Sequence, residues 1–185
     1  VPDIAILDPA IPAKMPPHIT ANTGMDVLAH AIEAVASTAA TSFTDPYAIE
    51  AISLVLNNLE TAFHEPDNQT ARFNMHNASA LAGMAFTNAS LGLVHSLAHK
   101  IGGEFGVTHG LANAILMPYI IRFNRQFSDK YARVEKLLGI ADLPAAIEAL
   151  NQKLNIPCCF QQCDEVDFDE SKFRDVLERM SQNAH

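Results

Sequence analysis

Residues 23–34 read Thr-Gly-Met-Asp-Val-Leu-Ala-His-Ala-Ile-Glu-Ala, and this proline-free stretch predicts an α-helix. Apolar side chains recur in it at spacings of three and four, as at Met25, Leu28 and Ile32, which places them on one helical face. The same spacing begins at Ile19 and continues through most of the chain. The body of the protein is therefore expected to be helical.

Start and stop signals divide the downstream sequence into further helices. Asp45 followed by Pro46 is typical of a helix start, and the helix that begins there should end near Phe63, before Pro66. The next helix is expected at 69–88, and its later part is rich in small side chains that allow another helix to approach closely. Further helices are predicted at 93–104, 111–127, 129–138, 144–154 and 170–182.

The N-terminal segment has a different pattern. Residues 4–7 form a short apolar run among prolines, which predicts one strand followed by an irregular connector to residue 17. No second strand pattern follows, so the fold class is all-α, a helical bundle with one short N-terminal strand. A lone strand has no sheet to join, and we therefore expect it to be left over from an α/β domain that this sequence lacks.

Length and composition favour one domain that spans residues 1–185. The chain has 185 residues, of which about half are apolar. A formal net charge of −9, without a Lys/Arg-rich tract, argues against nucleic acid or an anionic membrane as a partner. No apolar run approaches the roughly 18 residues of a membrane span, and the N-terminus lacks the basic start of a signal peptide. These features predict a soluble, cytoplasmic protein.

The three cysteines lie close together, at Cys158, Cys159 and Cys163. An odd number cannot be fully paired within the chain, which fits a reducing compartment. Their spacing lacks the Cys-x-x-Cys pattern and a fourth ligand, so a thiolate metal site is disfavoured.

Four residues in two segments suit a divalent metal by type and spacing: Asp26, His30, His95 and His109. Asp26 and His30 are four residues apart, as are His95 and His99, so each pair projects from one helical face. His109 follows a Gly-Gly-x-x-Gly turn that would let the chain double back toward His95. Asp26, His30, His95 and His109 are the candidate ligands.

The alternative is that these residues are unrelated core or solvated side chains, which is the better explanation for any single histidine. The four candidate ligands taken together weaken this alternative, because His30 and His95 both lie among apolar neighbours. Buried imidazoles and a buried carboxylate need a partner, and a shared cation would supply one.

Other polar residues near these segments have simpler explanations. Glu33 and Lys100 are attributed to a solvated face or a surface ion pair. Four further histidines are expected to be structural or solvated: His18, His64, His76 and His185.

Two long stretches, residues 23–34 and 95–114, resemble the iron-containing alcohol dehydrogenases. Residues 6–9 and 15–17 resemble this family's crossing from its first to its second domain. Residues 77–99 are most similar to the alcohol dehydrogenase module of the bifunctional aldehyde-alcohol dehydrogenases. The resemblance is strong from about Pro2 to Asn124 and general beyond.

The resemblance implies a helical C-terminal domain of the dehydroquinate-synthase-like type. In it Asp26, His30, His95 and His109 would bind a catalytic Fe(II), with zinc as the alternative metal. His99 would line the pocket where nicotinamide and substrate meet, and it is the candidate catalytic residue for relaying a proton or orienting the substrate.

The family's nucleotide-binding half is not found in this sequence. The glycines at 102–106 lie between two helical patterns rather than after a strand, so they do not match a dinucleotide-binding motif. NAD or NADP is therefore expected to bind mainly to the missing domain. We expect this chain to be a fragment that is inactive alone and forms homo-oligomers when full-length.

The implied activity is hydride transfer between a small primary alcohol or its aldehyde and a nicotinamide. Two alternatives stay open at this point. One is a non-enzymatic helical module for metal binding or oligomerisation, and the other is a zinc-dependent polyol dehydrogenase relative. The sequence does not decide which alcohol is the substrate or whether the cofactor is NAD or NADP.

Overall fold

The structure, a computed structural model, describes residues 4–163 and 170–182, and these residues form helices without a β-strand. The prediction of an all-α fold is confirmed. In chain order the elements are η1 (Pro12–Lys14), α1 (Pro17–Ala36), α2 (Asp45–His64), α3 (Gln69–Ala89), α4 (Leu93–Phe105), α5 (His109–Asn124), α6 (Lys130–Leu138), α7 (Leu143–Lys153), η2 (Phe160–Gln162) and α8 (Glu170–Gln182).

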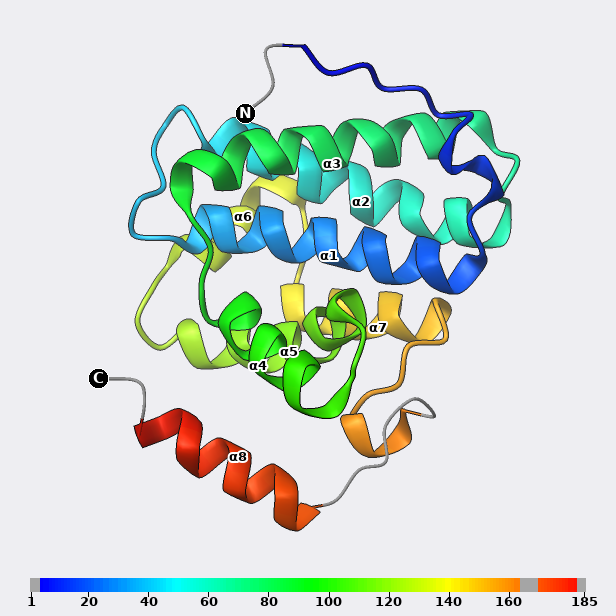
Figure 1. The fold of residues 1–185 in the computed structure, drawn as a ribbon. Coiled ribbons are helices and arrows are strands. Elements are labelled where there is room, and N and C mark those ends of the chain that lie inside the picture. Colours follow the sequence, from blue (N-terminus) through cyan, green and yellow to red (C-terminus); the bar gives the residue numbers. More distant parts are fainter. Residues whose placement is uncertain (1–3, 164–169, 183–185) are drawn as a thin grey trace.

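The helices form two groups that meet along α1 (Figure 1). Helices α1, α2 and α3 pack on one another, while α5 packs on α4 and α7. Helix α1 also packs along α5, so it belongs to both groups. Its inner side is deeply buried, with Met25 and Leu28 fully enclosed. Any residue on the α5 side of α1 therefore faces the junction between the two groups.

Small side chains allow the first three helices to approach closely, as the sequence predicted for α3. Ala78, Ala82 and Ala85 of α3 are buried. On α1, a β-carbon at Gly24 would lie 2.3 Å from Leu59 Cδ1 of α2. None of the described helices combines the length and apolarity that a membrane span requires.

Local signals set most helix ends. Asn68 caps α3 by accepting a hydrogen bond from the Ala71 amide (3.1 Å). Gly106 and Gly139 end α4 and α6 with φ values of 72° and 68°, a left-handed conformation that glycine adopts readily. The predicted bounds agree closely except for α5, predicted at 111–127. That helix begins two residues earlier, at His109, and gives way to turns after Asn124.

The strand predicted at residues 4–7 is not formed in the structure. Ile4 and Ile6 are 82% and 88% exposed. A strand is stabilised by hydrogen bonds to a neighbouring strand, and the described part of the chain contains none. The apolar run therefore forms no regular structure, and its two isoleucines are exposed.

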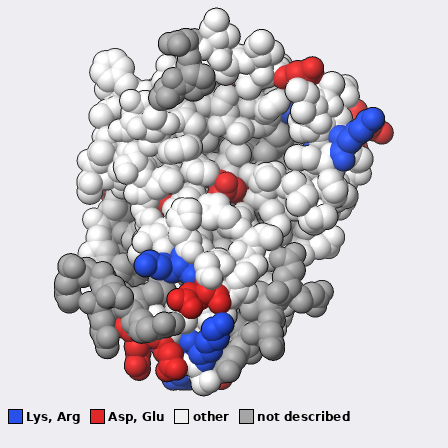
Figure 2. All heavy atoms as spheres, in the orientation of Figure 1, with Lys and Arg blue, Asp and Glu red and all other residues white. Residues whose placement is uncertain are grey.

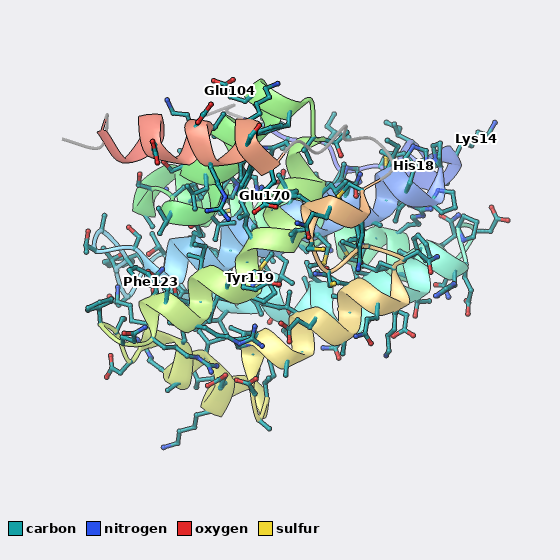
Figure 3. All side chains as sticks on the ribbon, turned by 90° about the horizontal axis from the view of Figure 1, so that it is seen from below. Lys14, His18, Glu104, Tyr119, Phe123 and Glu170 are labelled. Atoms are coloured by element: carbon teal, nitrogen blue, oxygen red, sulfur yellow. The ribbon has the colours of Figure 1, made fainter. Side chains whose placement is uncertain are left out.

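Apolar side chains are also exposed on α5, in the group of helices that contains α4 and α7. Figure 3 shows Tyr119 and Phe123 along α5, and they are 54% and 51% exposed. Helix α8 lies near the end of α4, where Phe173 packs against Phe105 with ring centroids 5.7 Å apart. These features lie outside the junction along α1.

Candidate metal centre

Helix α1 supplies Asp26 and His30, which are one turn apart. His30 Nδ1 donates a hydrogen bond to the backbone oxygen of Asp26 at 2.8 Å. The His30 ring stacks on Phe86 at 4.5 Å and lies 4.3 Å from the His95 ring, measured between ring centroids. The bond through Nδ1 leaves Nε2 as the nitrogen with a lone pair, which is the usual arrangement for a metal-binding histidine.

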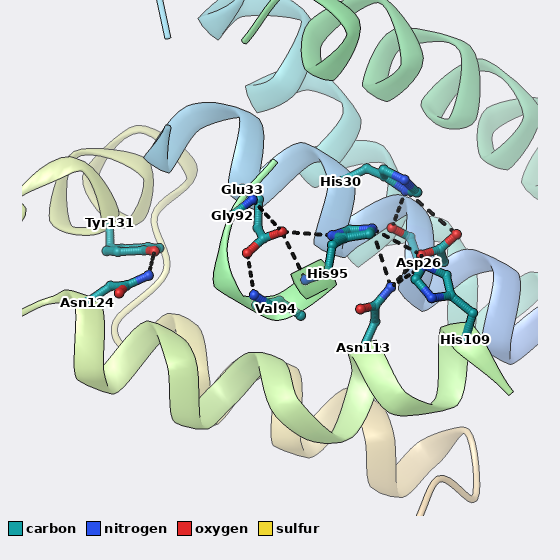
Figure 4. A network of polar contacts seen from close by, with 10 residues as sticks. All are labelled: Asp26, His30, Glu33, Gly92, Val94, His95, His109, Asn113, Asn124 and Tyr131. Carbon is teal, nitrogen blue, oxygen red and sulfur yellow. Dashed lines mark hydrogen bonds and ion pairs between the residues drawn. The ribbon is translucent and has the colours of Figure 1, made fainter. Parts of the chain in front are cut away.

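Helices α4 and α5 bring His95 and His109 to the same place (Figure 4). The left-handed turn at Gly106 reverses the chain between them, and their ring centroids lie 5.3 Å apart. Asp26 Oδ1 is 3.5 Å from His95 Nε2 and 3.3 Å from His109 Nε2. One ligand atom from each of these three residues lies within 4.8 Å of the others.

The structure thus brings Asp26, His95 and His109 into one cluster. The other two sequence-predicted residues lie beside it. His30 adjoins His95 but is outside the closely spaced group of ligand atoms. His99 is exposed and stacks on His109 with a centroid separation of 4.6 Å. Metal binding by the cluster remains a prediction.

Asn113 is a member of the cluster that the sequence interpretation missed. Its Nδ2 lies 2.6 Å from Asp26 Oδ1, 3.1 Å from His109 Nε2 and 3.4 Å from His95 Nε2. Its Oδ1 is buried without a hydrogen-bond partner. The signal that could have found it is spacing, because Asn113 lies four residues after His109 on the same face of α5.

Glu33 is not the surface residue that the sequence interpretation expected. It is 4% exposed and accepts hydrogen bonds from the backbone amides of Gly92 (3.0 Å), Val94 (2.6 Å) and His95 (3.3 Å). Its Oε2 also lies 2.7 Å from His95 Nδ1. The expectation failed because Glu33 lies against the start of α4, where backbone amides that have no partner within the helix donate hydrogen bonds to its carboxylate.

The remaining polar predictions are simpler. Lys100, His18 and His64 are exposed, as expected. His76 is half-buried, and its Nδ1 is buried without a partner. His185 lies outside the described residues.

The carboxylates and His95 influence one another's charge. Burial lowers the pKa of His95, but hydrogen bonds to Asp26 and Glu33 raise it more strongly, to about 9. Burial raises the pKa of Asp26 and of Glu33, yet contacts with His95 and neighbouring donors leave both below their ordinary values. Burial lowers the pKa of His30 and of His109. The cluster therefore holds ionised carboxylates that favour a positive charge between the helices.

These residues fit a divalent ion by their donor chemistry. When the rings of His95 and His109 are neutral and carry their proton on Nδ1, one carboxylate oxygen and two imidazole nitrogens face the Asn113 amide group, whose two N–H bonds cannot satisfy all three. Carboxylate and imidazole are ligands suited to iron and zinc. Acceptor atoms that outnumber their donors, in a partly buried setting, are stabilised by a bound cation or by protons.

The cluster is open on one side. The His95 side chain is 4% exposed, whereas those of Asp26 and His109 are 25% and 36% exposed. The face seen in Figure 2 carries few charged side chains over its middle, and most of them lie toward its lower end and its upper right edge. A small polar molecule could therefore approach the cluster from solvent.

The fold and the cluster together define a helical domain built around a candidate metal centre. The chain belongs to the Fe-containing alcohol dehydrogenase family, because the family's C-terminal model matches residues 20–184. The resemblance noted in residues 23–34 and 95–114 is thereby confirmed.

Individual relatives agree with this assignment. The chain is 50% identical to 1-propanol dehydrogenase PduQ of Salmonella typhimurium over 84% of this chain and 44% of the relative. It is 41% identical to the NADPH-dependent butanol dehydrogenase of Clostridium saccharobutylicum, over 99% of this chain and 48% of the relative. The chain thus spans about half the length of the curated relatives it matches.

A solved structure extends the comparison to the fold. The sulfoacetaldehyde reductase of Bifidobacterium kashiwanohense, in complex with NAD+, superposes with a TM-score of 0.89 at 30% identity. The match covers 99% of this chain and 49% of that one.

Proposed function

We propose that this chain is the metal-binding, catalytic helical part of an NAD(P)-dependent alcohol dehydrogenase that interconverts a primary alcohol and its aldehyde. The observation that carries the proposal is the convergence of Asp26, His95 and His109, from three different helices, on one point open to solvent. A structural ion is usually enclosed by four protein ligands, whereas a catalytic ion keeps a position for substrate. The open side therefore favours an enzyme over a non-enzymatic module.

The proposed ligands are Asp26, His30, His95 and His109, and the proposed ion is Fe(II), with zinc as the alternative. When bound, such an ion supplies Lewis acidity, which favours an ionised alcohol oxygen or polarises an aldehyde carbonyl. Of these residues, His30 alone lies outside the closely spaced group of ligand atoms, with its ring centroid 4.3 Å from that of His95. The hydrogen bond from His30 Nδ1 to the backbone oxygen of Asp26 leaves the lone pair on Nε2, the nitrogen that would bind the ion.

His99 is proposed to relay the proton of the substrate hydroxyl or to orient that hydroxyl. It is exposed, it lies one turn from His95, and it stacks on His109 at the open side of the cluster. From this position its imidazole can exchange a proton with solvent and hydrogen-bond a substrate hydroxyl beside the ion.

The names of the relatives support the proposed substrate and cofactor classes. Two of them are named for propanol and butanol, which supports a short primary alcohol here. One relative is named as NADPH-dependent and one neighbour was solved with NAD+, which supports a nicotinamide cofactor of either kind. We propose that the cofactor is held mainly by a second domain. A homo-oligomeric complete protein and a cytoplasmic location are also expected.

Metal titration of the 185-residue chain tests the proposed centre. Zn(II) affinity, measured by competition with a chromophoric chelator, should fall at least about 100-fold in Asp26→Asn, which removes the negative charge of a ligand, and in His95→Ala, which removes a ligand. His64→Ala removes an exposed histidine outside the cluster and should bind like wild type. Equal affinity in all four proteins would refute the site. In the complete enzyme, activity restored by Zn(II) but not by Fe(II) would instead indicate a zinc dehydrogenase.

A further inference from the structure

Glu33 links the helix that carries Asp26 and His30 to the helix that carries His95. We infer that Glu33 is a positioning residue of the proposed metal centre, which accepts the Nδ1–H of His95 and thereby directs Nε2 toward the ion. This inference rests on the proposed function. In this role Glu33 would act on the ion through His95 and would itself touch neither the ion nor the substrate.

The geometry of His95 supports the inference. Its Nδ1 lies 2.7 Å from Glu33 Oε2, while Nε2, on the other side of the ring, faces Asp26 Oδ1 at 3.5 Å. A carboxylate can only accept at Nδ1, so the neutral ring must carry its proton there. The lone pair then resides on Nε2, which is the atom that faces the cluster.

The surroundings of Glu33 hold its carboxylate in one orientation. Oε1 accepts from the Val94 amide, and Oε2 accepts from the amides of Gly92 and His95. Gly92, the residue before α4, has no side chain to cap the helix, so Glu33 takes that role from α1. The side chains of Glu33 and His95 are 5% and 4% exposed, which leaves little freedom for either to turn.

Only an ionised carboxylate can meet all these donors. Three backbone N–H groups and one ring N–H point at its two oxygens. A glutamine has the same shape but one oxygen, so its NH2 group would face either the Val94 amide or the donors around Oε2. The ring and the helix start would then compete for a single acceptor.

Helix capping alone would predict a different behaviour. If Glu33 served only to cap α4, its loss would lower the stability of the protein without changing the metal affinity of the folded molecules. If it positions His95, metal affinity must fall beyond any loss of stability. The two roles are therefore separable by measuring both quantities in the same variants.

The test compares Glu33→Gln with Asp45→Asn in the 185-residue chain. Like Glu33, Asp45 is a buried carboxylate at the start of a helix, in its case the first turn of α2 to which it belongs. It pairs with Arg133 at 3.1 Å and lies outside the cluster. Zn(II) affinity is measured by chelator competition, Co(II) coordination by visible absorption, and metal-free stability by urea unfolding. We expect Glu33→Gln to weaken Zn(II) binding about 10- to 100-fold and to alter the Co(II) spectrum. Asp45→Asn should change only stability.

A second variant covers the case in which Glu33→Gln does not fold. A β-carbon at Gly92 would lie 2.9 Å from Glu33 Oε1, so Gly92→Ala displaces the carboxylate while keeping its charge. It should weaken Zn(II) binding in the same direction. Affinities within threefold of wild type for whichever Glu33 or Gly92 variants fold would overturn the inference. Asp26→Asn in the same assay separates the two claims, because undiminished binding there would refute the metal centre itself.

Discussion

Gly110 determines how closely α5 approaches α1. A β-carbon at this position would lie 2.1 Å from the backbone oxygen of Asn22 and 2.6 Å from its carbonyl carbon. The obstacle is main chain rather than a flexible side chain, so it cannot move aside cheaply. His109 immediately precedes Gly110, and the contact therefore also fixes the distance between His109 and Asp26.

Replacing Gly110 by alanine should destabilise the protein. The clash forces α1 and α5 apart, and overpacking of this kind costs about 1–3 kcal/mol in the free energy of unfolding. Gly83→Ala is the matched control, because Gly83 lies inside α3 with nothing within 4 Å of the added carbon. That control should gain up to about 1 kcal/mol from better helix propensity. Urea unfolding measures the free energy of unfolding of both variants. Similar values for the two would contradict the close contact between Gly110 and Asn22.

Spacing in the sequence identifies part of the site and misses another part. Asp26, His30, His95 and His99 stand out as pairs four residues apart, and the glycine turn indicates the return of the chain to His109. Glu33 has no such local mark, and the spacing of four between His109 and Asn113 is a mark that the sequence interpretation did not use. Glu33 meets a partner 62 residues away, and Asn113 meets one 87 residues away. Whether a lone polar residue on a helix faces solvent or another helix depends on packing that spacing does not encode.

Helix ends are the part of the fold most accessible from sequence, because they depend on neighbouring residues. Prolines, capping side chains and glycines predict the helices closely. The strand expected at residues 4–7 depends instead on a distant partner, and its apolar pattern alone does not form it. For α5, the apolar pattern places the start of the helix at Leu111, its first apolar residue, whereas the helix begins at His109.

The N-cap of α3 should contribute measurably to the stability of the protein. Asn68→Ala removes the side-chain oxygen that accepts from the Ala71 amide, and loss of such a cap costs about 1 kcal/mol of stability. Asn57→Ala is the control, since Asn57 is exposed within α2 and its amide only donates back to Ser53. Thermal unfolding should show a lower midpoint for Asn68→Ala alone. A decrease of the same size in both variants would argue against the cap.

At the scale of the whole molecule, the site lies where the two groups of helices meet. Helix α1 packs on α2 and α3 along one side and on α5 along another. Apolar spacing predicts that α1 has a buried face, but it does not say which helices cover that face. The convergence of Asp26 with His95 and His109 is consequently a property of the assembled fold.

The 185-residue chain alone should not bind a nicotinamide cofactor appreciably. Pyrophosphate recognition in such proteins uses a glycine-rich turn between a strand and a helix, and the described residues contain no strand. Gly102 and Gly103 lie within α4, with Gly106 at its end. Calorimetric titration of the Zn(II)-loaded chain with NAD(H) and NADP(H) should give no micromolar binding. Such binding would show that these helices hold the cofactor themselves.

We propose that Asp26, His30, His95 and His109 together bind one ion and leave one of its positions for substrate. Anomalous scattering from crystals of the chain loaded with Fe(II) or Zn(II), recorded on both sides of the metal's absorption edge, tests it most directly. We expect one peak about 2.0–2.3 Å from the ligand atoms of these four residues, with a water molecule at a further position. A peak elsewhere, or an ion fully enclosed by protein ligands, would contradict it.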